Sequence, residues 1–248
     1  MKYQDILVLG QNLKELRPNK IHVINLKMKL TDQQKTFLLF LPILLILSTA
    51  LVFVSLSKWL SAELGYVFGF TFYWLVWCLL VPYFLLKREG VVSLFREKSP
   101  LFSKSNWLPA GLLILIVVIT VKMYPLTGLV ATPVRLLIIA IPVAIINGIF
   151  EELLWRGLYV KAFPDNVLLG LIFPAIGFAF WHISPQLVFP SESGIWPFVI
   201  STFFLGISYG WISYRTKSIK WNAISHSIGG ILDIGGAIAP SIFVLLFQ

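Results

Sequence analysis

The sequence VRLLIIAIPVAIINGIFEELLWRGLYV, residues 134–160, places two adjacent carboxylates and an arginine in a long apolar run. A helix needs about 20 apolar residues to cross the hydrocarbon core of a bilayer. A charged side chain inside that core costs at least a few kcal/mol, so such residues are rare unless they have a function. Glu151, Glu152 and Arg156 are therefore the first candidates for functional side chains.

The composition of the whole chain agrees with a membrane protein. Of the 248 residues, 58% are hydrophobic and 12% are charged, whereas a soluble domain carries about 25% charged residues. The fold class predicted is an all-α, polytopic transmembrane bundle of seven or eight helices. The predicted spans are residues 36–57, 65–86, 107–124, 134–160, 166–183 and 195–214, followed by a last apolar region, 221–248. Four glycines interrupt that region, so it forms either one helix or two.

Three parts of the chain differ in character. Residues 1–35 are basic and amphipathic, which predicts a cytoplasmic interfacial helix or a partly ordered tail. Residues 36–133 hold the N-terminal spans, and residues 134–248 form the core that carries the candidate functional groups.

The positive charge predicts the orientation of the chain. The formal net charge is +9, but the Lys and Arg residues lie in the connections between spans, where topology and anionic lipid explain them. We expect no nucleic-acid partner. With the N-terminus inside, only Lys58, Lys122 and Arg135 of the 20 Lys and Arg residues fall on the outer side. This bias predicts a multi-pass protein of the cell membrane with a cytoplasmic N-terminus.

Helical spacing separates the two glutamates. Glu152 and Arg156 are four residues apart and share a face, so they can form an ion pair. Glu151 points about 100° away, with Asn147 as its polar neighbour one turn earlier. An unpaired carboxylate in a low-dielectric site is suited to general-base work, so Glu151 is the predicted catalytic residue and the pair is supporting. The simpler alternative is an ion pair that only fixes helix packing.

Two histidines complete the candidate set. His182 ends the fifth span and shares a face with Phe178, and His226 shares a face with Asn222 in the last region. A single histidine in a span is most often bonded to a backbone carbonyl. One carboxylate and two imidazoles in consecutive apolar regions can instead activate a water and stabilise an oxyanion.

These motifs resemble those of the CAAX-processing and bacteriocin-processing (CPBP, or Abi) intramembrane proteases. The resemblance rests on Glu-Glu-x-x-x-Arg at 151–156, Phe-x-x-x-His at 178–182 and a final histidine at 226, and it covers about residues 134–235. It implies that Glu151 and His182 activate the attacking water and that His226 helps to stabilise the oxyanion.

One position departs from the family pattern. The family has Asn or Asp four residues after the final histidine, where this chain has Gly230. An oxyanion donor is then missing, and helical spacing nominates Asn222 as its substitute. Glu151, His182 and His226 could also bind zinc, but without a compact ligand spacing we prefer a mechanism that uses no cofactor.

The resulting hypothesis is an intramembrane endopeptidase, a hydrolase that acts on membrane-associated peptide or lipoprotein-like substrates. Its partners would be membrane lipid and that substrate. The alternative is a catalytically inactive scaffold that keeps the fold and positions another membrane or cell-wall protein, for which Gly230 is the main argument.

Overall fold

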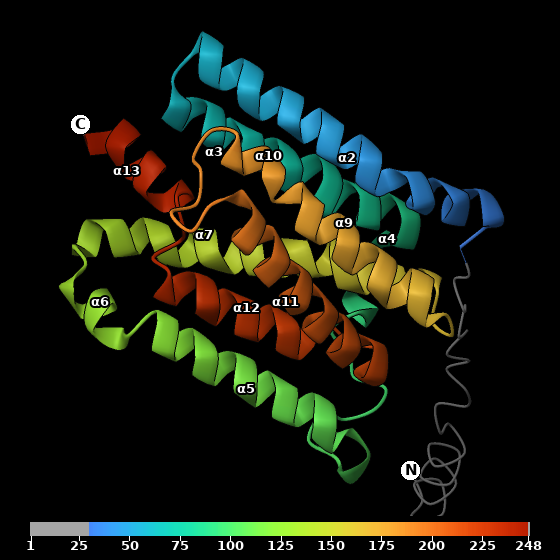
Figure 1. The fold of residues 1–248 in the computed structure, drawn as a ribbon. Coiled ribbons are helices and arrows are strands. Elements are labelled where there is room, and N and C mark those ends of the chain that lie inside the picture. Colours follow the sequence, from blue (N-terminus) through green and yellow to red (C-terminus); the bar gives the residue numbers. More distant parts are fainter. Residues whose placement is uncertain (1–29, 248) are drawn as a thin grey trace, which may run out of the picture.

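The computed structural model describes residues 30–247, which form a bundle of helices (Figure 1). Six segments are long and apolar enough to cross a membrane, and the chain is a multi-pass membrane protein. They are Asp32–Trp59, Ala62–Ser93, Lys104–Met123, Val134–Ala162, Leu168–Gln186 and Ile195–Thr216. The predicted all-helical transmembrane bundle is confirmed.

The helices of residues 30–247 include those of the six segments and also α6, α12 and α13. In chain order they are α2 (Asp32–Trp59), α3 (Ala62–Phe72), η1 (Tyr73–Leu80), α4 (Val81–Ser93), η2 (Lys104–Asn106), α5 (Trp107–Met123), α6 (Leu126–Ala131), α7 (Val134–Glu152), η3 (Leu153–Leu158), α8 (Tyr159–Ala162), η4 (Leu168–Ile172), α9 (Phe173–Trp181), α10 (Ile183–Gln186), α11 (Ile195–Thr216), α12 (Lys220–Leu232) and α13 (Ile238–Phe247). The segments η1, η3 and η4 are π-helical, and η2 is a short 3₁₀ turn.

The two ends of the chain add detail to the sequence predictions. Helix α2 begins four residues before the predicted start, because Thr31 and Gln34 form a reciprocal capping box. The last apolar region is broken into α12 and α13, with Gly235 and Gly236 at positive φ in the break. Apart from residues 30–35, the predicted N-terminal segment lies outside the described residues.

Helix α12 packs along α7, and small residues allow the close approach (Figure 1). A Cβ atom on Gly148 would lie 2.6 Å from the Ser227 Oγ, and one on Gly230 would lie 3.0 Å from the Ala144 Cβ. In membranes such small residues let two helix backbones come together. Gly230 therefore has a packing role, and this contact brings the glutamates of α7 next to α12.

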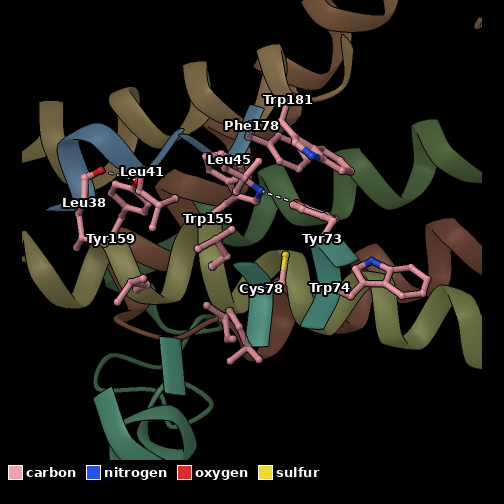
Figure 2. Close-up of a cluster of buried hydrophobic side chains, with 14 of the residues drawn as sticks. Leu38, Leu41, Leu45, Tyr73, Trp74, Cys78, Trp155, Tyr159, Phe178 and Trp181 are labelled. Atoms are coloured by element: carbon pink, nitrogen blue, oxygen red, sulfur yellow. Dashed lines mark hydrogen bonds between the residues drawn. The ribbon is translucent and has the colours of Figure 1, made fainter. Parts of the chain in front are cut away.

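Helices from both predicted halves share one apolar core. Its centre is a group of aromatic and leucine side chains from α2, η1, η3, α8 and α9 (Figure 2). The labelled members are Leu38, Leu41, Leu45, Tyr73, Trp74, Cys78, Trp155, Tyr159, Phe178 and Trp181. The Tyr159 hydroxyl donates to the Leu38 carbonyl at 2.8 Å, which ties α8 to α2. The core thus fixes the second span against the segment that carries the glutamates.

Candidate active site

The two glutamates stand at the end of α7, where the helix changes to the π-helical segment η3. Both side chains are buried, with Glu151 1% exposed and Glu152 fully enclosed. π-Helical turns inside α-helices are rare and occur frequently at functional sites. The carboxylates are therefore held inside the bundle on a segment of unusual geometry.

The ion pair predicted from the spacing is confirmed. Arg156 Nη1 donates to Glu152 Oε1 at 2.9 Å, and the guanidinium carbon lies 4.1 Å from the centroid of the Phe178 ring. Stacking on an aromatic face stabilises a buried guanidinium. Phe178 thus links the arginine to α9.

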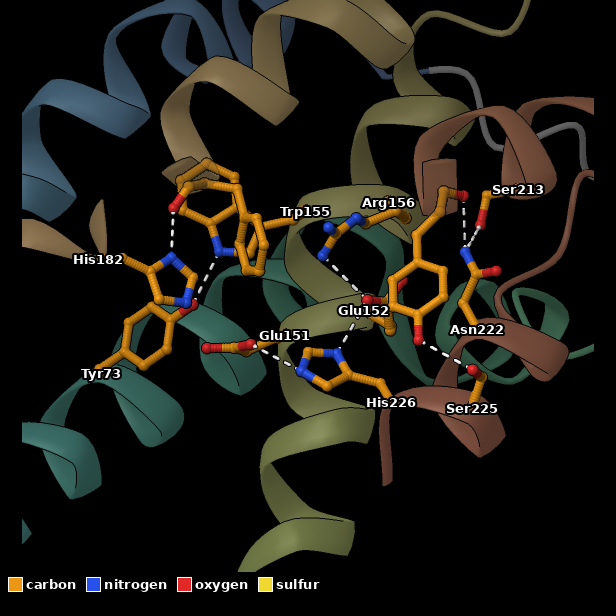
Figure 3. Close-up of polar contacts among 12 residues, drawn as sticks. Tyr73, Glu151, Glu152, Trp155, Arg156, His182, Ser213, Asn222, Ser225 and His226 are labelled. Carbon is orange, nitrogen blue, oxygen red and sulfur yellow. Dashed lines mark hydrogen bonds and ion pairs between the residues drawn. The ribbon is translucent and has the colours of Figure 1, made fainter. Parts of the chain in front are cut away.

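His226 lies between the two carboxylates (Figure 3). Its Nδ1 is 3.1 Å from Glu152 Oε1, and its Nε2 is 3.5 Å from Glu151 Oε2. Since a carboxylate oxygen only accepts, Nδ1 carries a proton and donates it to Glu152. Glu152 therefore holds the orientation of the imidazole as well as pairing with Arg156.

The contact between Glu151 and His226 requires a further proton. If Glu151 were ionised and His226 neutral, two lone pairs would face each other across 3.5 Å. One added proton removes this repulsion and balances the two carboxylates against Arg156.

His182 belongs to the same polar region through Phe178. Its Nδ1 lies 2.7 Å from the Phe178 carbonyl oxygen, and the two rings are 4.5 Å apart. A carbonyl only accepts, so Nδ1 donates and Nε2 keeps a lone pair for a proton. Phe178 in turn contacts Arg156, so His182 is joined to the Glu152–His226 pair only indirectly, through Phe178 and Arg156.

The two predicted supporting amides are used elsewhere. The Asn147 Oδ1 accepts a hydrogen bond from Trp74 Nε1 at 2.9 Å. The Asn222 amide nitrogen donates to the Tyr209 carbonyl at 2.7 Å and to Ser213 Oγ at 2.8 Å. With both amide protons occupied, Asn222 has none to give an oxyanion. The side chain ties α12 to α11 in this geometry, which argues against the expected role of Asn222 as the missing donor.

Sequence reasoning missed Tyr73 and Trp155. Trp155 Nε1 donates to the Tyr73 hydroxyl at 2.7 Å, and this hydroxyl lies beside the Glu151 carboxylate (Figure 3). Trp155 stands inside the quoted Glu-Glu motif and could have been singled out there. Tyr73 is one of many aromatic residues in the second span, and no signal in the sequence distinguishes it.

The residues do not fit a zinc site in this arrangement. In the part of the chain that the structure describes, no group of three His, Cys, Asp or Glu side chains is placed to hold a metal ion. Of the three residues named as possible zinc ligands, Glu151 and His226 contact each other at 3.5 Å, and a metal would have to break this contact. The steps below therefore use only side chains of this chain.

A cavity of mixed lining adjoins the cluster. Its volume is about 370 Å³, and Arg156, Lys98, Lys161 and Lys217 line part of it. Arg156 thus separates this cavity from Glu152.

The comparisons with known proteins agree with this geometry. Residues 133–231 match the family model described as type II CAAX prenyl endopeptidase Rce1-like. These residues are similar to the Rce1-like family. The resemblance read from the motifs is confirmed, and the matched range includes Glu151, His182 and His226. No curated protein and no solved structure gave a match.

Proposed function

We propose that the protein is an intramembrane endopeptidase that hydrolyses peptide bonds in membrane-associated peptides or lipoprotein-like proteins. The observation that carries the proposal is His226 bracketed by Glu151 and Glu152 in the buried interior of an Rce1-like segment. Buried ionisable groups at membrane depth are expensive and mark functional sites. A packing ion pair would need only Glu152 and Arg156, whereas here a second carboxylate and an imidazole are buried as well.

Each group is assigned a role, and that of His182 rests on its unpaired Nε2 rather than on a contact with Glu151. Glu151, helped by the free Nε2 of His182, takes a proton from a water whose oxygen attacks the scissile carbonyl carbon. The protonated Nε2 of His226 turns from Glu151 to donate to the oxyanion that forms. When the carbon–nitrogen bond breaks, the proton taken from the water goes to the leaving amine. Glu152 and Arg156 keep His226 oriented throughout.

The same proposal assigns an orientation and a route for water. The N-terminus and the end of the bundle rich in Lys and Arg face the cytoplasm, as the distribution of positive charge favours. The cavity beside Arg156 opens toward that end, among Lys98, Lys161 and Lys217. Water would then approach the site from the cytoplasmic side while the rest of the bundle faces lipid.

The test is turnover of a quenched fluorescent peptide by the protein in nanodiscs, with Glu151→Gln as the comparison. Gln keeps the shape of the side chain but cannot accept the proton of the water. Loss of at least about 10²-fold in turnover with an unchanged thermal midpoint supports the proposal, given the usual contribution of general-base catalysis. If the wild type hydrolyses none of a library of membrane-associated peptides, the scaffold alternative is favoured.

A further inference from the structure

Tyr73 is buried at the junction between the second span and the candidate active site. It is 0% exposed and stands at the start of η1, outside the 133–231 range of the family match. Its ring stacks on Trp181 with centroids 3.8 Å apart and planes 17° apart (Figure 2). Its position is therefore fixed by packing, and only its hydroxyl group is left for a polar role.

The hydrogen bond from Trp155 sets the direction of the Tyr73 proton. Because the indole N–H can only donate, the Tyr73 oxygen accepts at 2.7 Å, and its own proton must go to another acceptor. The Glu151 carboxylate lies beside the hydroxyl (Figure 3). Its Oε2 is 3.5 Å from His226 Nε2 and accepts no hydrogen bond within the described residues 30–247. The Cys78 thiol is also near, but sulfur is a weak acceptor. The carboxylate is the better acceptor for this proton.

The two partners of this hydrogen bond come from two π-helical segments. Tyr73 is the first residue of η1, Trp155 lies in η3, and these segments pack against each other. A π-turn adds a residue to the helical turn and so changes where side chains point. The site thus depends on two local departures from α-helical geometry that meet at one hydrogen bond.

We propose that Tyr73 is a positioning residue that donates its hydroxyl proton to Glu151 and holds the carboxylate toward His226. Trp155 and Trp181 keep the Tyr73 ring in place, so the N-terminal spans supply part of the active site. The inference rests on the proposed function in that Glu151 performs the chemistry. A misplacement of about 1 Å at a reacting group can lower the rate about 10²-fold. A contact that fixes the Glu151 carboxylate can therefore matter for turnover.

The first experiment compares Tyr73→Phe with Tyr159→Phe in the full-length protein. Tyr73→Phe keeps the ring and its stacking on Trp181 but removes the hydroxyl. We expect kcat to fall about 10-fold to 100-fold with KM unchanged, since the substrate does not contact Tyr73. Tyr159→Phe is the matched control, because it removes a buried hydroxyl that only donates to a backbone carbonyl. It is expected to lower the thermal midpoint while kcat stays at the wild-type value.

A double-mutant cycle separates positioning from general loss of packing. Trp155→Phe should lower kcat because the Tyr73 hydroxyl loses the donor that directs its proton. In the Tyr73→Phe background, Trp155→Phe should lower kcat little further, since the Tyr73 hydroxyl is already absent. Fully additive losses, or a Tyr73→Phe protein with wild-type kcat, would overturn the inference.

A second measurement needs no turnover. In the substrate-free protein, the infrared difference between the wild type and Glu151→Gln identifies the bands of the Glu151 carboxyl group. Tyr73→Phe should shift these bands, and Tyr159→Phe should leave them in place. Unchanged bands in Tyr73→Phe exclude the contact. If the bands shift but the protein has no peptidase activity, the contact between Tyr73 and Glu151 is supported and the proposed protease function is contradicted.

Discussion

At the scale of single residues, Glu152 accepts two hydrogen bonds at the centre of the site. It accepts from Arg156 Nη1 at 2.9 Å and from His226 Nδ1 at 3.1 Å through the same oxygen. Glu151 has only the 3.5 Å contact with His226 and the neighbouring Tyr73 hydroxyl. The two adjacent carboxylates are therefore placed differently. Glu152 accepts two hydrogen bonds through Oε1, while its Oε2 accepts none within the described residues, and Glu151 has the looser contacts.

This difference predicts opposite results for two isosteric changes. Glu152→Gln should destabilise the protein by roughly 3–5 kcal/mol, because it leaves the buried Arg156 charge without its counter-ion. Glu151→Gln should keep the fold and lose turnover. Thermal midpoints in detergent and peptide hydrolysis measure the two effects. If Glu152→Gln folds normally and abolishes turnover while Glu151→Gln retains it, the roles are reversed.

Asn222 gives a second prediction at this scale. Asn222→Ala removes two buried hydrogen bonds to α11 and leaves their acceptors unpaired, which costs about 1–3 kcal/mol for each group left unpaired. We expect a lower thermal midpoint and, in the folded fraction, near wild-type turnover. A stable Asn222→Ala protein with turnover reduced about 10²-fold would restore the oxyanion role that the structure argues against.

At the scale of elements, the contact between α7 and α12 decides whether the site exists. It brings His226 against the two glutamates, and it depends on glycines where the backbones approach. Gly230 faces Ala144 of α7, while its neighbour Gly229 faces Thr120 of α5 at 3.6 Å from a built Cβ, an ordinary contact. Two adjacent glycines of one helix thus have different tolerance for a side chain.

Gly230→Ala and Gly229→Ala therefore form a matched pair. A Cβ at 230 would lie 3.0 Å from the Ala144 Cβ, so α12 must move away from α7, with an overpacking cost of about 1–3 kcal/mol. Gly229→Ala should be neutral or stabilising by roughly 0.5–1 kcal/mol. Thermal midpoints measure both. By the same argument Gly230→Asn should destabilise the protein rather than supply an oxyanion donor. A stable and more active Gly230→Asn protein would contradict the packing role of Gly230.

At the scale of the whole molecule, the distribution of Lys and Arg residues predicts the orientation in the membrane, and maleimide labelling of introduced cysteines tests it. Cys78 is the only cysteine and is 0% exposed, so the wild type should react little with an impermeant maleimide. Lys104→Cys and Lys122→Cys stand at the two ends of the third spanning segment. With the N-terminus cytoplasmic, Lys122→Cys should be labelled in intact cells and Lys104→Cys only after permeabilisation. The opposite pattern would invert the topology.

The sequence alone determined the features that depend on composition and on spacing within one helix. Apolar length predicted the membrane bundle, because a span must cover a hydrocarbon core of fixed thickness. The four-residue interval predicted the Glu152–Arg156 pair, because such positions share a helical face. The motifs with Glu151, His182 and His226 indicated a resemblance to CAAX-type proteases, and the family match over residues 133–231 agrees with it.

Tertiary structure alone decided what depends on which faces of distant helices meet. Tyr73 is 78 residues from Glu151 in the chain and becomes its neighbour because η1 packs against α7 and η3. The amide of Asn222 is occupied because α11 supplies two acceptors for it. Gly230 has a packing role because α7 approaches it closely. Periodicity describes a single helix, whereas these three outcomes are set by packing between helices, which no local pattern encodes.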